Sequence, residues 1–139
     1  MSAPNMPADD LRRAVGTALL GDTDLLTLLD GPAIHDALPD RKRPPYVVIG
    51  RTIASDWSTA TEGGAAVTLF LHVWTRGERR DDNQAIQAAV TRRLAASIQL
   101  ANHHLVALRL ELAETRRDRL TGHAHAVLRF RAVTEPIEI

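Results

Sequence analysis

Six histidines are the residues whose chemistry first suggests a site, because imidazole binds metals and exchanges protons near neutral pH. His123 and His125 are two residues apart in a strand-like segment, so their rings would share one face. His103 and His104 begin the preceding strand, and the hairpin between the two strands would place them at its opposite end. With no cysteine and no HExxH motif, we expect no metal site and no cofactor.

Nucleophilic catalysis has equally little support. No GxSxG motif occurs, and the hydroxyls at residues 58–61 lie in a polar connection where such side chains are common. The glycines at 63 and 64 precede a strand, whereas a phosphate-binding loop precedes a helix. Helix capping explains the carboxylate pairs at residues 9–10 and 81–82, which stand at expected helix starts. We therefore expect a protein that is not an enzyme.

Length and composition indicate one ordinary domain. The chain has 139 residues, 45% of them hydrophobic, and 17 basic residues balance 17 acidic ones. A net charge of zero predicts no sequence-specific nucleic-acid partner and favours self-association. No signal peptide and no apolar run long enough for a bilayer are present, which predicts assembly in the cytoplasm without a membrane partner.

Periodicity predicts the elements that would position a site. We expect a flexible tail at residues 1–8 and a single domain at residues 9–139. Helices are predicted from Asp9 to about residue 20, at residues 24–29 after a cap at Asp22 or Thr23, and from Asp82 or Asn83 to about Leu100. Strands are predicted at residues 33–38, 46–54, 66–75, 104–113 and 123–133.

The order α-α-β-β-β-α-β-β predicts an α+β fold, a mostly antiparallel sheet of about five strands with helices packed on one face. The side chains expected to face the helices in the third and fourth strands are Val67, Leu69, Leu71, Val73, Val106, Leu108, Leu110 and Leu112. The core positions expected in the long helix are Ile86, Ala89, Val90, Leu94, Ser97 and Ile98.

The opposite face of this sheet combines arginines with aromatic side chains. The residues expected there are Phe70, Trp74, Arg109, Glu111, Arg129 and Arg131. Arginine and aromatic residues are enriched at protein interfaces, so this face is a candidate contact surface. The alternative is a solvated sheet face on which arginine stems cover apolar area.

Five segments, in order, resemble a tail-completion family found in prophages and gene transfer agents. They are IHDALP with PYVVIG at residues 34–50, DWST with Thr61, Glu62 and Gly64, HVWTR at residues 72–76, and LRFRAVTEP at residues 128–136. The resemblance extends over about residues 9 to 136. One departure is the basic turn at residues 116–122, where a plainer Asp/Gly turn is expected.

This resemblance implies a structural virion protein, a terminator that caps the tail tube as a homo-hexameric ring at the head-proximal end of the particle. Its implied partners are other copies of itself, the major tail-tube protein and a head–tail connector or stopper protein, and no catalytic residues are implied. We expect contacts to a neighbouring subunit or the tube from Asp56, Trp57, Trp74, Arg129 and Arg131.

Three other functions stay open at this point. A head-completion or connector subunit is the nearest alternative, the histidines leave room for a small oligomeric α+β enzyme, and a regulatory binding module is the third. Capsid and tail genes beside this gene would favour the structural protein, as would an oligomer seen in a solution mass measurement.

Trp57 gives a first test, because a large aromatic side chain in a polar connection is expected to contact a partner. Trp57→Ala should reduce assembly into particles more than it reduces the free energy of unfolding. Particle yield and urea denaturation measure the two effects. Equal loss of both would instead indicate that Trp57 covers its own sheet.

Overall fold

A computed structural model of the chain describes residues 6–56, 63–77 and 80–137. In these segments the elements follow the expected order α-α-β-β-β-α-β-β, which confirms the α+β class. The helices are α1 (Pro7–Leu20), α2 (Thr23–Leu29) and α3 (Arg80–Ala95). The strands are β1 (Ile34–His35), β2 (Tyr46–Asp56), β3 (Ala65–Thr75), β4 (His103–Arg117) and β5 (Ala124–Pro136).

The strands form one sheet in the order β1-β2-β3-β5-β4. The short β1 is parallel to β2, and the other three pairings are antiparallel, so the expected mostly antiparallel sheet is confirmed. Strand β3 lies between β2 and β5 and pairs with β5 along its whole length. Its inward side chains are fully buried, as alternation predicts: Val67, Leu69, Leu71 and Val73.

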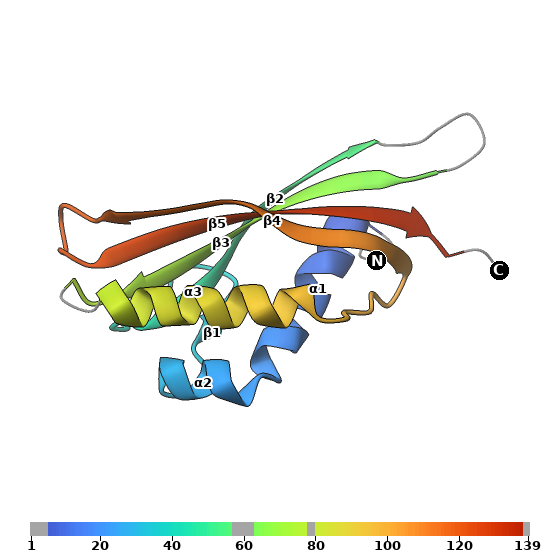
Figure 1. Cartoon of the computed structure of the whole chain (residues 1–139). Helices are drawn as coiled ribbons and strands as arrows, with labels where there is room; N and C mark the ends of the chain where they lie inside the picture. The colour runs from blue at the N-terminus through green and yellow to red at the C-terminus, as the bar shows by residue number, and fades with distance from the viewer. Residues whose placement is uncertain (1–5, 57–62, 78–79, 138–139) are drawn as a thin grey trace.

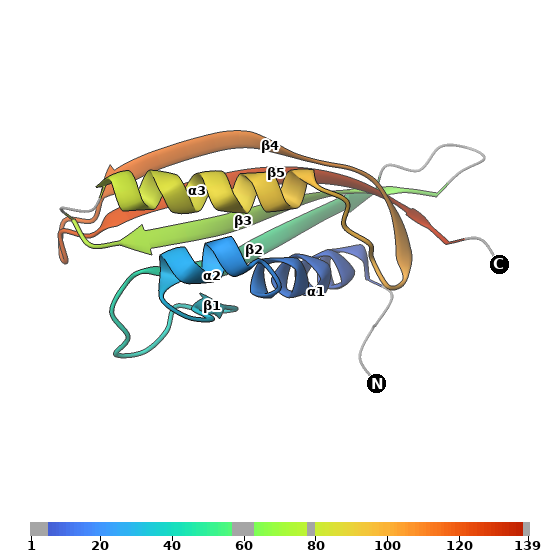
Figure 2. The same cartoon turned by 60° about the horizontal axis from the view of Figure 1, so that its bottom comes forward.

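All three helices lie on one face of the sheet, and no described element covers the other face (Figure 1). Figure 2 shows α3 in front of the strands, with α2 and α1 in a row along its side. Helix α2 packs mainly on these two helices and is the element farthest from the sheet in Figure 1. Each helix buries leucine, valine or isoleucine at helical spacing, among them Leu11, Val15, Leu19, Leu25, Leu29, Ile86, Val90 and Leu94.

Helix α3 is shorter than expected because Asp10 holds the chain that follows it. The carboxylate of Asp10 is 2% exposed and accepts hydrogen bonds from the amides of Ala101, at 3.2 Å, and Asn102, at 2.9 Å. It also lies 2.8 Å from His103 Nδ1. The helix therefore ends at Ala95, so Ser97 and Ile98 follow it. Ser97 is exposed, against the prediction, whereas Ile98 packs against the core as predicted, but from the loop.

The same contacts change the interpretation of the first carboxylate pair. Burial raises the pKa of Asp10, but hydrogen bonds from His103 and the two loop amides outweigh burial and leave that pKa below its usual value. Helix α1 begins at Pro7, two residues before the expected start, and its cap residue Met6 makes no side-chain hydrogen bond. Asp10 thus joins α1 to the start of β4 and is not a cap.

Asn83 also has a role other than the predicted cap, since α3 already begins at Arg80. Its side chain is completely buried and donates to the carbonyl of Val73 at 3.1 Å, to Thr75 Oγ1 at 3.1 Å and to the carbonyl of Ala124 at 3.4 Å. Gln87 donates to Asn83 Oδ1 at 2.7 Å. This amide therefore fixes the first turn of α3 to adjacent ends of β3 and β5.

Strand β4 departs from simple alternation. Register shifts occur between Leu105 and Ala107 and between Leu110 and Leu112, so two residues oppose one across the ladder at each place. As a result Val106 and Leu112 are 47% and 45% exposed, and their expected burial was wrong. Leu108 and Leu110 pack against the core as predicted.

The remaining differences are at element ends. Strand β1 has two residues where six were expected, and β4 continues four residues past the expected end, to Arg117. Asp22 caps α2 by accepting from the amide of Leu25 at 3.1 Å, as predicted. In the segments that the structure describes, no helix is long and apolar enough to cross a membrane.

The buried amide predicts a stability effect. Asn83→Ala removes the side-chain amide that serves the carbonyls of Val73 and Ala124 and the hydroxyl of Thr75 from a completely buried position, and should lower the free energy of unfolding by about 1–3 kcal/mol. Urea denaturation measures this change. The exposed neighbour Gln84 provides the control, and Gln84→Ala should change stability by less than about 0.5 kcal/mol. Equal effects of the two substitutions would contradict the assigned role of Asn83.

Candidate functional site

The face of the sheet opposite the helices is the candidate site (Figure 1). Residues directly paired across strands share a face, so the outward side chains of β3 lie beside those of β5. The pairs are Phe70 with Arg129, His72 with Val127, and Trp74 with His125. All six are half-buried, in contrast to the fully buried side chains between them. We call this surface the open face.

An aromatic stack occupies the end of the open face near the start of β5. The rings of Trp74 and His125 are 3.9 Å apart between centroids and nearly parallel, at 6°. The rings of His72 and His125 are 5.1 Å apart, and His72 Nδ1 lies 2.8 Å from His125 Nε2. One of these nitrogens therefore carries a hydrogen and donates a hydrogen bond to the other.

Both imidazoles of this pair are held in the neutral form. Burial, together with the electrostatic effects of His72 and Arg116, lowers the pKa of His125 to about 4 against an opposing effect of Asp118. Burial also lowers the pKa of His72. The pair stacks on the indole of Trp74 and uses one nitrogen of each imidazole for the contact between the two rings, so it acts as a packing unit.

Arginines cover the middle and the far part of the open face. The guanidinium of Arg51 lies 5.1 Å from the ring centroid of Phe70, a cation–π geometry. Arg129 Nε is 3.4 Å from Glu111 Oε1, at side chains that are 40% and 32% exposed. Arg131 is paired directly with Arg109 of β4, so two positive charges stand side by side. The open face thus carries aromatic rings near the start of β5 and positive charge over its middle and far part.

A cavity of about 520 Å³ lies at the edge of β2, beside the stack. Arg12 of α1 closes one side by donating to the carbonyls of Ile49, at 3.2 Å, and Gly50, and it lies 3.7 Å from Asp36. Position 50 requires glycine, because a β-carbon there would be 2.7 Å from His72 Nε2. The exposed Leu38 also lines this cavity.

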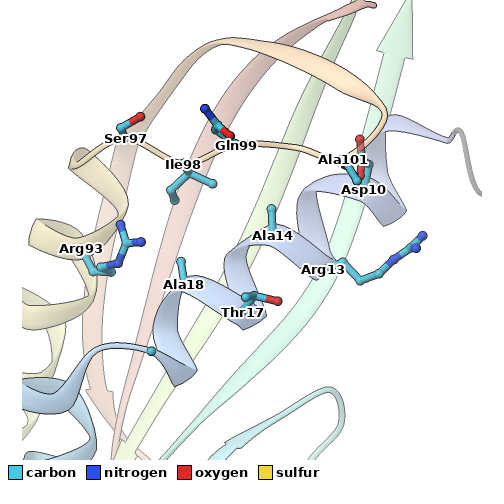
Figure 3. Close-up of a pocket in the computed structure, with 11 residues that line it drawn as sticks. Asp10, Arg13, Ala14, Thr17, Ala18, Arg93, Ser97, Ile98, Gln99 and Ala101 are labelled. Carbon is cyan, nitrogen blue, oxygen red and sulfur yellow. Dashed lines mark hydrogen bonds between the residues drawn. The ribbon is translucent and has the colours of Figure 1, made fainter.

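A second cavity, of about 420 Å³, lies on the helix side between α1 and the loop after α3 (Figure 3). Ala14 and Ala18 face Ile98 across it, so its walls are largely apolar. The buried carboxylate of Asp10 at one end is already bonded to the loop. The Asp10 carboxylate is therefore not available to a ligand, and we interpret this cavity as a gap between packed elements.

The described residues offer little for catalysis or metal binding. Within residues 6–56, 63–77 and 80–137, no group of three or more His, Asp or Glu side chains is arranged to hold a metal ion. His104 is paired with Glu135 and His125 with Arg116, so they lie at opposite ends of the β4–β5 hairpin, as the sequence predicted. The arginines of the open face, beside aromatic rings, match the composition enriched at protein interfaces, so this face stays a candidate contact surface.

Comparison with known proteins identifies the family. Residues 13–135 match the family model described as tail completion protein gp17. The chain belongs to this family. The family consists of structural tail proteins of virions and not of enzymes, which confirms the resemblance seen in the sequence.

Two solved structures are similar to this tail completion protein. A chain in the virion of a native gene transfer agent particle is 31% identical, with a TM-score of 0.81, and the match covers 90% of this chain and 94% of that one. The gp17 protein of bacteriophage SPP1 is 21% identical, with a TM-score of 0.58 over 94% and 91% of the two chains, and shares the fold. No curated protein sequence matches the chain.

The structure places three of the five expected contact residues on the open face: Trp74, Arg129 and Arg131. Asp56 is separate from them, since it pairs with Ala65, whose other neighbour Thr134 faces the helix side. Trp57 lies outside the described residues. Whether these five residues contact a partner stays a prediction.

Two features of the site were missed by sequence reasoning. His72 and His125 are 53 positions apart, and their contact depends on β3 pairing with β5, which was not predicted. Arg51 reaches Phe70 because a register shift between Ile49 and Thr52 turns it toward the open face. The sequence offered one signal for these contacts, namely that polar residues occupy outward positions on both long strands.

The histidine pair predicts a pH dependence of stability. The pKa of His125 in the folded protein, about 4, is below the ordinary value of 6.5, so the unfolded chain binds more protons between these limits. The free energy of unfolding should therefore fall as the pH is lowered from 6.5 towards 4. His125→Phe keeps a ring on Trp74 without a titrating group and should flatten this slope in urea denaturation.

The exposed His104 is the matched control. His104→Phe should retain the wild-type slope between pH 6.5 and 4. A slope unchanged by His125→Phe would show that the pair does not hold its imidazoles neutral.

Proposed function

We propose that this tail completion protein forms a homo-hexameric ring that caps the tail tube, ends its polymerisation and presents a surface for joining the head. Family membership supports this proposal, together with the 31% identity to a chain of a gene transfer agent virion. The proposed partners are other copies of the chain, the major tail-tube protein and the head–tail connector or stopper. Six subunits are proposed because related tail caps are six-fold.

The shape of the domain suits this role. A subunit that ends a tube needs one surface that matches the last tube ring and another that does not, and this requires no chemistry. The β2–β3 hairpin extends beyond the helix layer (Figure 1), and near its end Ile53 is 47% exposed. The β4–β5 hairpin extends in the opposite direction, with Leu120 96% exposed at its turn. These two ends are candidates for the tube and connector contacts.

Deletion of the gene tests the proposal. Without a cap, we expect filled heads that lack tails, alongside free tubes of abnormal length, and a plasmid copy of the gene should restore tailed particles. Electron microscopy of lysates measures both features. Normal tailed particles from the deletion strain would contradict the proposal.

Tube length separates the proposed cap from the nearest alternative. Loss of a head-completion or connector subunit would prevent joining but leave the tube with its normal termination. Unattached tubes of uniform, wild-type length would therefore favour a connector subunit over a terminator.

A further inference from the structure

The open face has positive charge that its own chain leaves unbalanced. Arg109 and Arg131 are direct cross-strand neighbours, an arrangement that destabilises an antiparallel pair. Among the described residues neither has an ion-pair partner, whereas Arg129 has Glu111. An exposed apolar side chain also lies on this face, since Leu112 is 45% exposed and pairs with Arg129.

Helix α2 has the opposite charge. Residues 14–40 contain five aspartates and no lysine or arginine. Asp24 is exposed on α2, and Asp30 ends the helix in the left-handed conformation, with φ of 58°. That position favours glycine or asparagine, and a carboxylate there meets the negative end of the helix dipole. In the described part of the chain neither aspartate has an ion-pair partner.

Apolar area accompanies these aspartates. Leu28, four residues after Asp24 and thus on the same side of α2, is 42% exposed, and Leu20 just before α2 is 45% exposed. We call Leu20, Asp24, Leu28 and Asp30 the α2 surface. Pro44, which directly follows the basic residues 41–43, shares a cavity with Leu28 and Arg76, so basic residues lie near one end of α2, and Asp24 and Asp30 supply the acidic charge of the α2 surface.

The two surfaces are on opposite sides of the molecule, because α2 is the element farthest from the sheet (Figure 1). We propose that the open face of one subunit binds the α2 surface of the next copy of the same chain. Arg109 and Arg131 then meet Asp24 and Asp30, and Leu112 meets Leu28. The Arg109–Arg131 pair and Asp30, whose charges are locally unfavourable, thereby gain partners of opposite charge.

Charge complementarity selects this arrangement over a two-fold one. Two open faces in contact would bring arginines against arginines, and two α2 surfaces would bring aspartates together. A head-to-tail dimer still has one free open face and one free α2 surface, so further copies can add at both ends. The chain of subunits closes into a ring where the rotation between neighbours allows it. The inference rests on the proposed ring and specifies which surfaces build it.

Cysteine crosslinking tests the contact directly, because the chain has no native cysteine. The double variant Asp24→Cys/Arg131→Cys is expressed in the host strain that lacks its own copy, and purified particles are treated with a bismaleimide. On a denaturing gel we expect a ladder of multimers. Mixing the two single variants should give dimers only, because each contact then joins one residue 24 to one residue 131.

The controls distinguish the contact from chance proximity. Ala95→Cys/Arg131→Cys places the first thiol at the exposed end of α3, outside both surfaces, and should give no ladder. Dimers from Arg131→Cys alone would indicate a two-fold contact and overturn the proposal. So would particles that contain Asp24→Cys/Arg131→Cys without a ladder. Neither result depends on where the ring is located, which the deletion experiment examines separately.

Charge exchange provides a second readout if cysteines impair incorporation. Asp24→Arg/Asp30→Arg and Arg109→Glu/Arg131→Glu should each reduce the yield of tailed particles about tenfold or more, and all four changes together should restore most of it. Arg92→Glu, on the exposed side of α3, should have little effect. If every variant unfolds like the wild type, the proposal is overturned when the quadruple variant yields no more tailed particles than either double variant.

Discussion

In the part of the chain that the structure describes, three helices lie on one side of a five-stranded sheet, and no element covers its other side. Inside, Val67, Leu69, Leu71 and Val73 lose all contact with water, and this burial is the main stabilising term of the domain. Outside, the alternating positions of the same strand must be compatible with partial exposure. The chain meets this requirement with aromatic rings that stack on each other and arginines whose stems cover apolar area.

This one-sided burial explains why polar connections hold the helix layer in place. Asp10 joins α1 to the start of β4, and Asn83 joins α3 to the ends of β3 and β5. Both side chains are almost completely buried, and their hydrogen bonds restrict how the helices can slide over the sheet. The open face thereby receives a fixed geometry, which a repeated contact between identical subunits requires.

Sequence reasoning was most successful where one strand has one clear period. The alternation at residues 66–75 predicted which side chains of β3 face the helices, and the order of elements predicted the fold class. It failed where distant contacts decide the local structure. The end of α3 depends on Asp10, some 90 positions away, and the exposure of Val106 and Leu112 depends on bulges that the pattern of β4 does not reveal. The contact of His72 with His125 required the pairing of β3 with β5.

The family places this protein in the tail of a particle, and the central claim is that copies of it form the last ring of the tube. Cryo-electron microscopy of purified tails, with the side-chain density of the terminal ring traced against this sequence, tests that claim most directly. We expect one ring of this chain at the head-proximal end, with the symmetry of the tube beneath it. A terminal ring that traces to another protein, with this chain elsewhere or absent, would contradict it.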